Sequence, residues 1–129
     1  MEGYSISQVA QRFGVEPHTL RFYEKEGVIQ PQRTAGGVRY FTEEDISRLE
    51  MALCLKNTGM SLKDIRRYFQ LVGEGDDALE QRLQIFLEHR ERVLGEIAEL
   101  QKHLCKIDHK IQWCRDALEE RQQEQRHAG

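Results

Sequence analysis

A heptad repeat of apolar residues in the C-terminal part of this 129-residue chain restricts its fold more than any other feature. Apolar side chains recur at alternating steps of four and three residues, and they fill eleven of the twelve such positions from Leu79 to Leu118. The positions between them are mostly Glu, Arg, Gln, Lys and His. A regular apolar stripe with polar flanks predicts a coiled-coil helix, which we place at residues 79–120.

A lone helix of this length has too much apolar surface to bury on the rest of the chain. At roughly 1.5 Å per residue, the stripe from residue 79 to residue 118 would run for about 60 Å. The simplest partner is the same helix in a second copy of the chain, related by a two-fold axis, because it carries the same apolar stripe. We therefore expect a homodimer. The side chains expected in this interface are Phe86, Val93, Ile97, Leu100, Leu104, Ile107, Ile111 and Leu118.

Residues 1–72 carry the pattern of a separate domain that begins with two short helices. Apolar residues at helical spacing follow Ser5 and Ser7, either of which can cap a first helix through its hydroxyl, and Gly14 ends that helix. Pro17 suits the first turn of a second helix, where its missing N–H costs nothing. Two short helices joined by a glycine-containing turn predict a helix-turn-helix unit.

A β-hairpin, or wing, is predicted at residues 30–41. Val28-Ile29 and Val38-Arg39-Tyr40-Phe41 are strand-like runs on either side of a break in the helical pattern. Between them lies the pair Gly36-Gly37, and two glycines accept the positive φ of a tight hairpin turn.

Two further helices are expected between the wing and the coiled coil. Thr42 begins one of them, with Asp45 placed to complete the cap, and Ser61 begins the other. Glycines and acids at residues 73–78 predict a linker, and the polar residues 121–129 predict a flexible tail. The predicted fold class is mainly α, with a winged helix-turn-helix domain at residues 1–72, a small β-hairpin wing and a long coiled-coil dimerisation helix.

The distribution of charge favours DNA as the partner of the N-terminal domain, although the net charge of the whole chain is −3. The stretch from Gly27 to Thr42 holds Arg33 and Arg39 and no acidic residue, and a local basic patch is enough to contact phosphates. Four side chains of the second helix can hydrogen-bond to phosphates or base edges: His18, Thr19, Arg21 and Tyr23. The competing interpretation is an ordinary surface hairpin beside a helix whose aromatic residues only pack in a core.

Five motifs in residues 4–72 resemble the winged-helix domain of MerR-type transcription regulators. They are Tyr4-Ser5-Ile6-Ser7-Gln8-Val9-Ala10, Thr19-Leu20-Arg21-Phe22-Tyr23-Glu24-Lys25-Glu26-Gly27, Arg33-Thr34, Gly37-Val38-Arg39-Tyr40-Phe41 and Gly59-Met60-Ser61-Leu62. The long helix from Leu79 resembles the antiparallel dimerisation helix of that family. The resemblance implies dimers that bind a promoter whose spacer is too long for RNA polymerase. They bend and untwist it until its elements are in register, which is activation by DNA deformation.

The resemblance also implies roles for individual residues. By matched position, Arg21 and Tyr23 would contact the DNA backbone and groove, and Arg39 with Tyr40 would contact phosphates from the wing. Lys56 would reach a phosphate from the third helix. The expected DNA-binding set is completed by Ser7, His18, Thr19, Arg33 and Gly37. Glu16 departs from the family, which commonly has Ser or Thr as the cap of the recognition helix, so we expect a weaker cap there.

The surroundings of Cys54 resemble a branch of this family, the NmlR-like regulators, that responds to reactive aldehydes and related electrophiles. The shared features are the run from Cys54 to Leu62, Gly75-Asp76-Asp77 and His89-Arg90. The resemblance implies a thiol that an electrophile modifies and a role in the stress response.

The residues around Cys54 do not by themselves explain a reactive thiol. Reactive thiols lie near a cation or a helix N-terminus, whereas Cys54 is late in its helix and its neighbour one turn earlier is Glu50. Activation would have to come from residues distant in sequence or from the partner subunit. A small buried hydrophobe at the domain junction is the alternative.

Two other functions stay open at the level of sequence. A metal-responsive regulator would use Cys105, His109 and Cys114, but Cys105 and Cys114 would be about 13 Å apart along a straight helix, too far for one ion. A coiled-coil interaction module would bind protein in place of DNA.

Several classes of protein are not expected. No nucleophile, base and orienting acid occur at motif spacing and there is no Gly-rich phosphate loop, so we expect no enzyme, cofactor or metal. No apolar run is long enough to cross a bilayer, so no membrane partner is expected. Three cysteines without an export signal predict reduced thiols and a cytoplasmic location.

Overall fold

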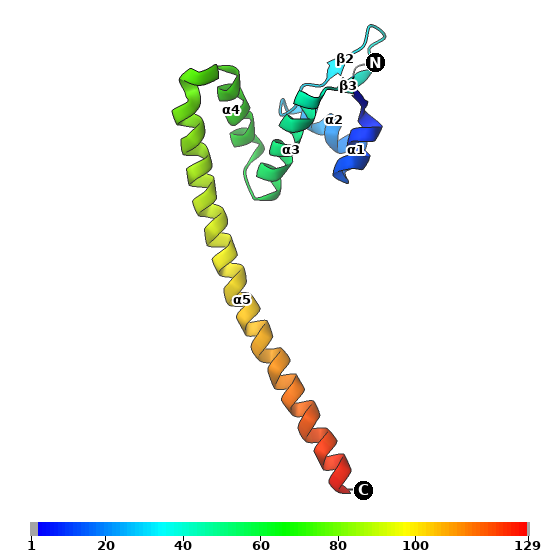
Figure 1. The fold of residues 1–129 in the computed structure, drawn as a ribbon, viewed down its shortest axis with the longest axis vertical. Helices are drawn as coiled ribbons and strands as arrows, with labels where there is room; N and C mark the ends of the chain where they lie inside the picture. Colours follow the sequence, from blue (N-terminus) through cyan, green and yellow to red (C-terminus); the bar gives the residue numbers. More distant parts are fainter. Residues whose placement is uncertain (1–2, 129) are drawn as a thin grey trace. The chain divides into compact units, whose positions relative to one another are not determined.

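The computed structural model describes residues 3–128, and the chain falls into two compact units, Met1–His89 and Arg90–Gly129. It is mainly helical, as predicted (Figure 1). The elements in chain order are β1 (Tyr4–Ser5), α1 (Ile6–Phe13), α2 (Pro17–Lys25), β2 (Gln32–Arg33), β3 (Arg39–Phe41), α3 (Glu43–Asn57), α4 (Leu62–Gly73), the 3-10 helix η1 (Gly75–Ala78) and α5 (Leu79–Ala128).

Helices α1 and α2 form the predicted helix-turn-helix unit. Ser5, not Ser7, caps α1: the backbone N–H of Gln8 donates to the Ser5 hydroxyl over 3.2 Å, and the Gln8 side chain accepts from the Ser5 N–H. Gly14 ends α1 with a φ of 67°, in the left-handed region that glycine adopts without strain. Pro17 is the first residue of α2, and Glu16 before it makes no side-chain capping bond, in agreement with the weak cap expected there.

The wing belongs to a three-stranded antiparallel sheet in the order β1-β3-β2. Strand β1 was not predicted, because a run of two residues is too short to show a strand period. The register pairs Tyr4 with Phe41, and Arg33 with Arg39. Only Gly37 of the expected glycine pair has a positive φ, at 84°, so the prediction for Gly36 was wrong.

The strand-like run Val28-Ile29, which precedes the predicted hairpin, does not form a strand, since these residues follow directly on the turn that ends α2. The backbone N–H groups of Val28 and Ile29 both donate to the carbonyl of Tyr23, at 2.9 and 3.5 Å. Both side chains are buried in the core. Their apolar character therefore reflects burial in a turn, not pairing in a sheet.

Helices α3 and α4 supply much of the core and begin at the predicted caps. Thr42 and Asp45 form a complete capping box at the start of α3, and the Ser61 hydroxyl accepts from the N–H of Asp64 at the start of α4. The most deeply buried side chains come from several elements of the first unit: Phe41, Leu20, Leu49, Ile65, Val9 and Val28.

The expected linker and tail both contain more helix than predicted. Residues Gly75–Ala78 form η1 and bury Ala78, and α5 continues through Ala128 instead of ending near residue 120. In the first turns of α5, Ile85 and Phe86 pack against the core and His89 is buried. None of the helices described is both long enough and apolar enough to span a membrane.

Candidate nucleic-acid interface

Helix α2 presents the expected polar side chains to different degrees. His18 and Arg21 are exposed, whereas Thr19 is half-buried and Tyr23 is half-buried with its ring packed against the core. Leu20 is buried and Phe22 is exposed, so only one of the three apolar side chains in this run is a full core residue. The exposed donors of α2 are therefore available to a ligand outside the domain.

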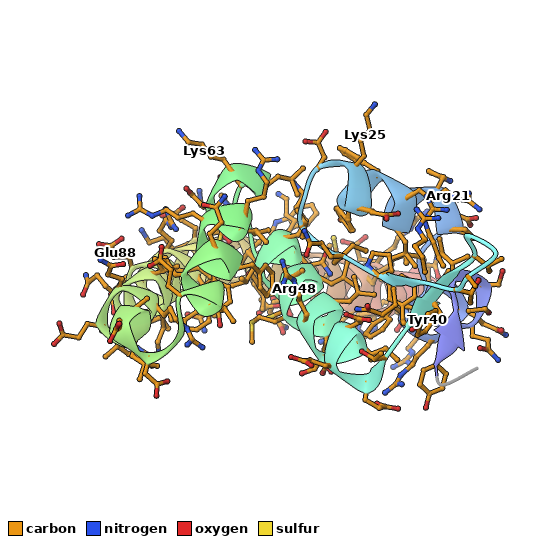
Figure 2. The ribbon with its side chains drawn as sticks, turned by 90° about the horizontal axis from the view of Figure 1, so that it is seen from above. Arg21, Lys25, Tyr40, Arg48, Lys63 and Glu88 are labelled. Atoms are coloured by element: carbon orange, nitrogen blue, oxygen red, sulfur yellow. The ribbon has the colours of Figure 1, made fainter. Side chains whose placement is uncertain are left out.

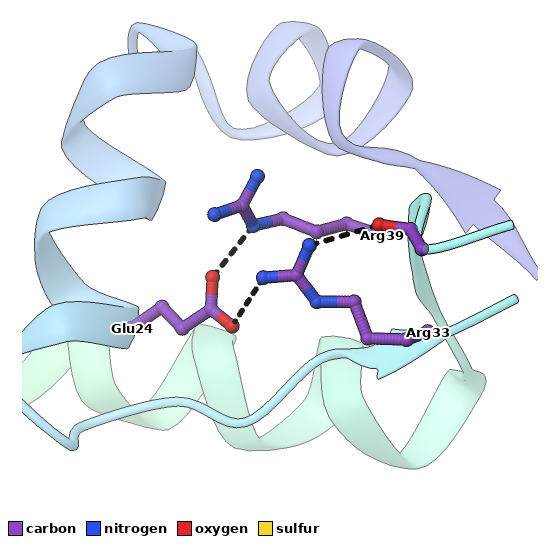
Figure 3. Close-up of polar contacts among 4 residues, drawn as sticks. Glu24, Arg33 and Arg39 are labelled. Atoms are coloured by element: carbon purple, nitrogen blue, oxygen red, sulfur yellow. Dashed lines mark hydrogen bonds and ion pairs between the residues drawn. The ribbon is translucent and has the colours of Figure 1, made fainter.

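The wing is attached to α2 by one carboxylate, that of Glu24 (Figure 3). Glu24 Oε1 accepts from Arg39 Nε over 2.6 Å, and Glu24 Oε2 accepts from Arg33 Nη2 over 3.2 Å. Arg33 Nη1 also donates to the carbonyl of Gly37, 3.1 Å away in the wing turn. The structure thus brings Arg33, Gly37 and Arg39 together with α2, and it adds Glu24, to which the sequence interpretation assigned no role.

The electrostatics of this cluster favour the charged form of Glu24. Burial acts to raise the pKa of the Glu24 carboxyl, but the hydrogen bond from Arg39 and the charges of Arg39 and Arg33 together outweigh it and lower the pKa. Figure 3 shows that Arg39 bonds to Glu24 through Nε, and within residues 3–128 no hydrogen bond engages its two terminal nitrogens. A guanidinium held in this way can still offer two N–H groups to a phosphate.

Three cations of this unit extend to one side. Figure 2 shows Arg21 and Lys25 from α2 and Lys63 from the first turn of α4 on the same side. Lys25 and Lys63 were not among the predicted site residues. Lys25 lies inside a matched motif and Lys63 directly follows one, so the motif boundaries could have pointed to both.

The remaining predicted DNA-binding residues are more scattered. Ser7 is exposed on α1, Tyr40 is half-buried on β3, and Lys56 is exposed near the C-terminal end of α3. No hydrogen bond or ion pair in residues 3–128 joins Lys56 to α2 or to the wing. Lys56 is therefore not part of the cluster that Glu24 organises.

Cys54 is exposed on α3, which argues against the alternative of a buried hydrophobe. Its side chain lines an open groove of about 600 Å³ between α3, α4 and the first turns of α5. The other lining residues are Glu44, Ser47, Arg48, Glu50, Met51, Tyr68, Phe69, Val72 and Arg82. Two of these, Arg48 and Arg82, are cations, and two, Glu44 and Glu50, are acids.

The cations of this groove lie against its aromatic walls. The guanidinium of Arg48 is 4.3 Å from the ring centre of Phe69, and that of Arg82 is 5.9 Å from the ring centre of Tyr68. Arg48 is also held by its Nε–H, which donates to the carbonyl of Val28 over 3.2 Å. Stacking and this hydrogen bond together fix the position of its guanidinium.

The candidate metal ligands on α5 do not form a complete site within one chain. Cys105 Sγ lies 3.9 Å from His109 Nε2, and Cys114 is exposed elsewhere on the helix. Within residues 3–128, no three His, Cys, Asp or Glu side chains are grouped so that they could hold a metal ion.

Comparison with protein families identifies the domain that carries these residues. Residues 4–71 match the MerR HTH family regulatory protein model, and residues 46–110 match the model described as "MerR, DNA binding". The chain is 41% identical over 109 residues to an uncharacterized HTH-type transcriptional regulator of Haemophilus influenzae, covering 84% of this chain and 81% of that protein. It is 40% identical over 91 residues to the HTH-type transcriptional regulator AdhR of Bacillus subtilis, covering 70% of this chain and 65% of that protein.

Solved structures give the same result. The crystal structure of HiNmlR, a MerR family regulator that lacks the sensor domain and is bound to promoter DNA, aligns with a TM-score of 0.81 and 40% identity. The alignment covers 89% of this chain and 92% of that one. A MerR family transcriptional regulator from Bacillus thuringiensis aligns with a TM-score of 0.79 and 38% identity, covering 84% and 96% of the two chains.

Proposed function

This chain belongs to the MerR family of DNA-binding helix-turn-helix transcription regulators, and from that premise we propose how it acts. A homodimer binds a promoter with an overlong spacer and, when an electrophile modifies Cys54, bends and untwists the DNA so that RNA polymerase can initiate. Membership of a DNA-binding family decides against an interaction module that binds only protein.

The proposed DNA contacts come from α2 and the wing. Arg21 and Tyr23 contact the backbone and groove, assisted by Ser7, His18 and Thr19. Arg39 and Tyr40 contact phosphates from the wing, with Arg33 and Gly37 shaping its turn, and Lys56 reaches a phosphate from α3. The arrangement of Arg39 supports this proposal, since Glu24 engages only Nε and leaves the two terminal nitrogens of the guanidinium for other partners.

A test of the DNA interface compares Arg39→Ala with Arg126→Ala, which removes a cation from the far end of α5. We expect Arg39→Ala to weaken binding to the operator and to flatten the dependence of affinity on salt, because a phosphate contact is lost. Arg126→Ala should bind as wild type does. Both variants should sediment as wild type does. Wild-type affinity of Arg39→Ala would remove the wing from the interface.

The apolar seam of α5 supports the proposed homodimer. Leu100 and Leu104 are 68% and 54% exposed in a single chain, and Ile97, Ile107, Ile111 and Leu118 are exposed on the same seam. An exposed stripe of this extent is the kind of surface that a partner helix covers. Phe86, which is also predicted in this interface, is partly buried and packs against Tyr68 of its own chain, with ring centres 4.8 Å apart.

The observation that carries the proposed sensing is the exposed thiol of Cys54 in the groove beside Arg48 and Arg82. A thiol adds to an α,β-unsaturated aldehyde such as acrolein by forming a bond from sulfur to the β-carbon, and the proton of the thiol ends on the α-carbon. No oxidant or reductant is needed.

Cys54→Ser is the test of this proposal, with Cys105→Ser and Cys114→Ser as matched controls because all three thiols are exposed. Selection of duplexes that bind the protein, from a random pool, first gives an operator sequence. The measured quantity is the amount of transcript that purified RNA polymerase makes from a promoter that carries this operator. Acrolein should stimulate transcription with wild type and both controls but not with Cys54→Ser, which should still bind the promoter. Normal stimulation of Cys54→Ser would end the thiol hypothesis.

A further inference from the structure

His89 is a buried polar residue that DNA binding does not explain. Its side chain is 7% exposed, and its Nε2 atom lies 2.8 Å from the Thr58 hydroxyl. Its Nδ1 atom is shielded from solvent and has no hydrogen-bonding partner in the part of the chain that the structure describes. A buried polar atom without a partner lowers stability, so an apolar residue would serve simple packing better at this position.

Thr58 links His89 to the residue proposed as the sensor. Thr58 is the C-cap of α3, and its hydroxyl bonds to the carbonyl oxygen of Cys54 at 2.7 Å and to that of Leu55 at 3.2 Å. A hydroxyl has one proton, and carbonyls only accept, so the Thr58 proton faces the helix. The hydroxyl oxygen must then accept from His89, which places the ring proton on Nε2.

The result is a continuous path of two hydrogen bonds from the last turn of α3 to α5. The Nε2–H group of His89 donates to the hydroxyl of Thr58, which donates to the backbone of Cys54. His89 is also the final residue of the first compact unit, and α5 continues from it without a break to Ala128. The path therefore ends on the helix that carries the dimerisation seam.

We propose that Thr58 and His89 are positioning residues that transmit the modification of Cys54 to α5. The proposal rests on the sensing function proposed above for Cys54. An adduct on the Cys54 side chain has to be accommodated in the groove, and the last turn of α3 adjusts to it. Because the Cys54 carbonyl is tied to Thr58 and Thr58 to His89, that adjustment is passed to the start of the dimerisation helix.

A structural role and a transmitting role for Thr58 and His89 can be distinguished by a variant that keeps the fold but lacks the hydrogen bond between them. Replacing both partners by apolar residues of similar shape, in Thr58→Val/His89→Leu, removes the unpartnered Nδ1 along with the hydrogen bonds of the Thr58 hydroxyl, while the backbone N–H of residue 58 still donates to the Cys54 carbonyl. Such a replacement is close to neutral or stabilising for the fold. If the pair transmits a signal, the double variant should keep its thermal stability and its promoter affinity but respond more weakly to the electrophile.

The experiment compares full-length wild type, Thr58→Val, Thr58→Ser, His89→Leu, the double variant and Cys54→Ser. Acrolein is the probe, mass spectrometry measures the adduct on Cys54, and transcription from the selected promoter measures the response. We expect adducts to form at the wild-type level in every variant that keeps Cys54. Stimulation should fall about fivefold in Thr58→Val, His89→Leu and the double variant, a size typical of coupling between sites. Thr58→Ser should restore it, because serine keeps the hydroxyl.

Each outcome has a separate meaning. Wild-type stimulation in Thr58→Val and His89→Leu would overturn the transmitting role while leaving Cys54 as the sensor. Loss of the Cys54 adduct in these variants would also overturn it, because the residues would then control access to the thiol. Wild-type stimulation in Cys54→Ser would instead remove the sensing function itself. His103→Leu, at an exposed histidine of α5, is the matched control and should respond normally.

Discussion

At the residue scale, Glu24 joins two elements that are distant in sequence. It accepts hydrogen bonds from Arg33 and Arg39, which lie on the two paired strands of the wing. The same residue lies in α2, the helix proposed to enter the DNA groove. One carboxylate therefore links both strands of the wing to α2, although an acid near DNA is electrostatically unfavourable.

Glu24→Gln should make the protein less stable near neutral pH, by an amount on the order of 1 kcal/mol because these partly exposed pairs are screened by solvent. The pKa of Glu24 is lowered in the folded chain, so its contribution is present above the ordinary carboxyl pKa of about 4.5 and is lost as pH falls through the folded value. Urea unfolding of wild type and Glu24→Gln should therefore converge below that pH. Glu50→Gln, at an exposed acid, is the control and should show no such convergence.

The two glycines of the wing turn provide a second test at the residue scale. Gly37 has a φ of 84°, whereas Gly36 does not have a positive φ. Gly37→Ala should lower the free energy of unfolding by about 1 kcal/mol, because a side chain is strained in the left-handed region. It should also weaken operator binding, since the Gly37 carbonyl holds Arg33.

Gly36→Ala is the matched control for this prediction. A Cβ at Gly36 would lie 3.9 Å from the Thr34 hydroxyl, which is ordinary contact, so stability and binding should stay near wild type. Equal effects of the two substitutions on unfolding in urea would show that backbone conformation does not limit the wing.

At the element scale, the helix ends follow local chemistry. Ser5, Thr42 and Ser61 each accept a backbone N–H three residues later, and each begins a helix where the sequence placed one. Such caps can be predicted from the sequence because the donor and the acceptor of each hydrogen bond are close in the chain. The strand β1 was missed for the opposite reason, since its pairing with β3 joins Tyr4 to Phe41 across most of the domain.

Among helices α1 to α4, α2 is the one that begins without a side-chain cap, so its N-cap can be improved by substitution. Glu16→Ser should raise the free energy of unfolding by about 1 kcal/mol. The serine hydroxyl can accept a hydrogen bond from a backbone N–H of the first turn of α2, which no side chain caps in the wild type. Ser5→Ala should lower it by a similar amount at α1. Thermal unfolding followed by circular dichroism measures both, and a destabilised Glu16→Ser would mean that the acid has another role there.

At the scale of the whole molecule, the proposal gives the seam of α5 and the domain that precedes it separate tasks, dimerisation and DNA binding. The apolar side chains of α5 that contact the core lie in its first turns, as Ile85 and Phe86 show. Beyond His89 most of the seam is exposed in a single chain. A second copy that covers this seam would pair two DNA-binding domains, which matches a two-fold operator.

Leu104→Lys should convert the proposed dimer into a monomer, because a charge would be placed in an apolar interface. Gln112→Lys puts the same charge on a polar position of α5 outside the seam and is the control. Sedimentation equilibrium gives the mass of each. A Leu104→Lys variant that sediments as wild type does would show that the seam is not the dimer interface.

The sequence by itself determined the features that depend on neighbours along the chain. The helix-turn-helix, the caps, the position of the wing and the heptad stripe are local patterns of polar, apolar and turn residues. The resemblance of five motifs also indicated the family, and the comparisons confirmed it.

Only the tertiary structure decided what distant residues do to one another. It placed Glu24 between two arginines, buried Val28 and Ile29 in a turn, and opened a groove at Cys54 in which Arg82 is a neighbour. It also joined Thr58 to His89 across 31 positions of sequence. These contacts depend on how helices and strands pack in three dimensions, and no period or local motif encodes them. In the same way, the spacing of the heptad stripe in α5 predicted a seam, but only the packing showed that Phe86 of this stripe contacts the core of its own chain.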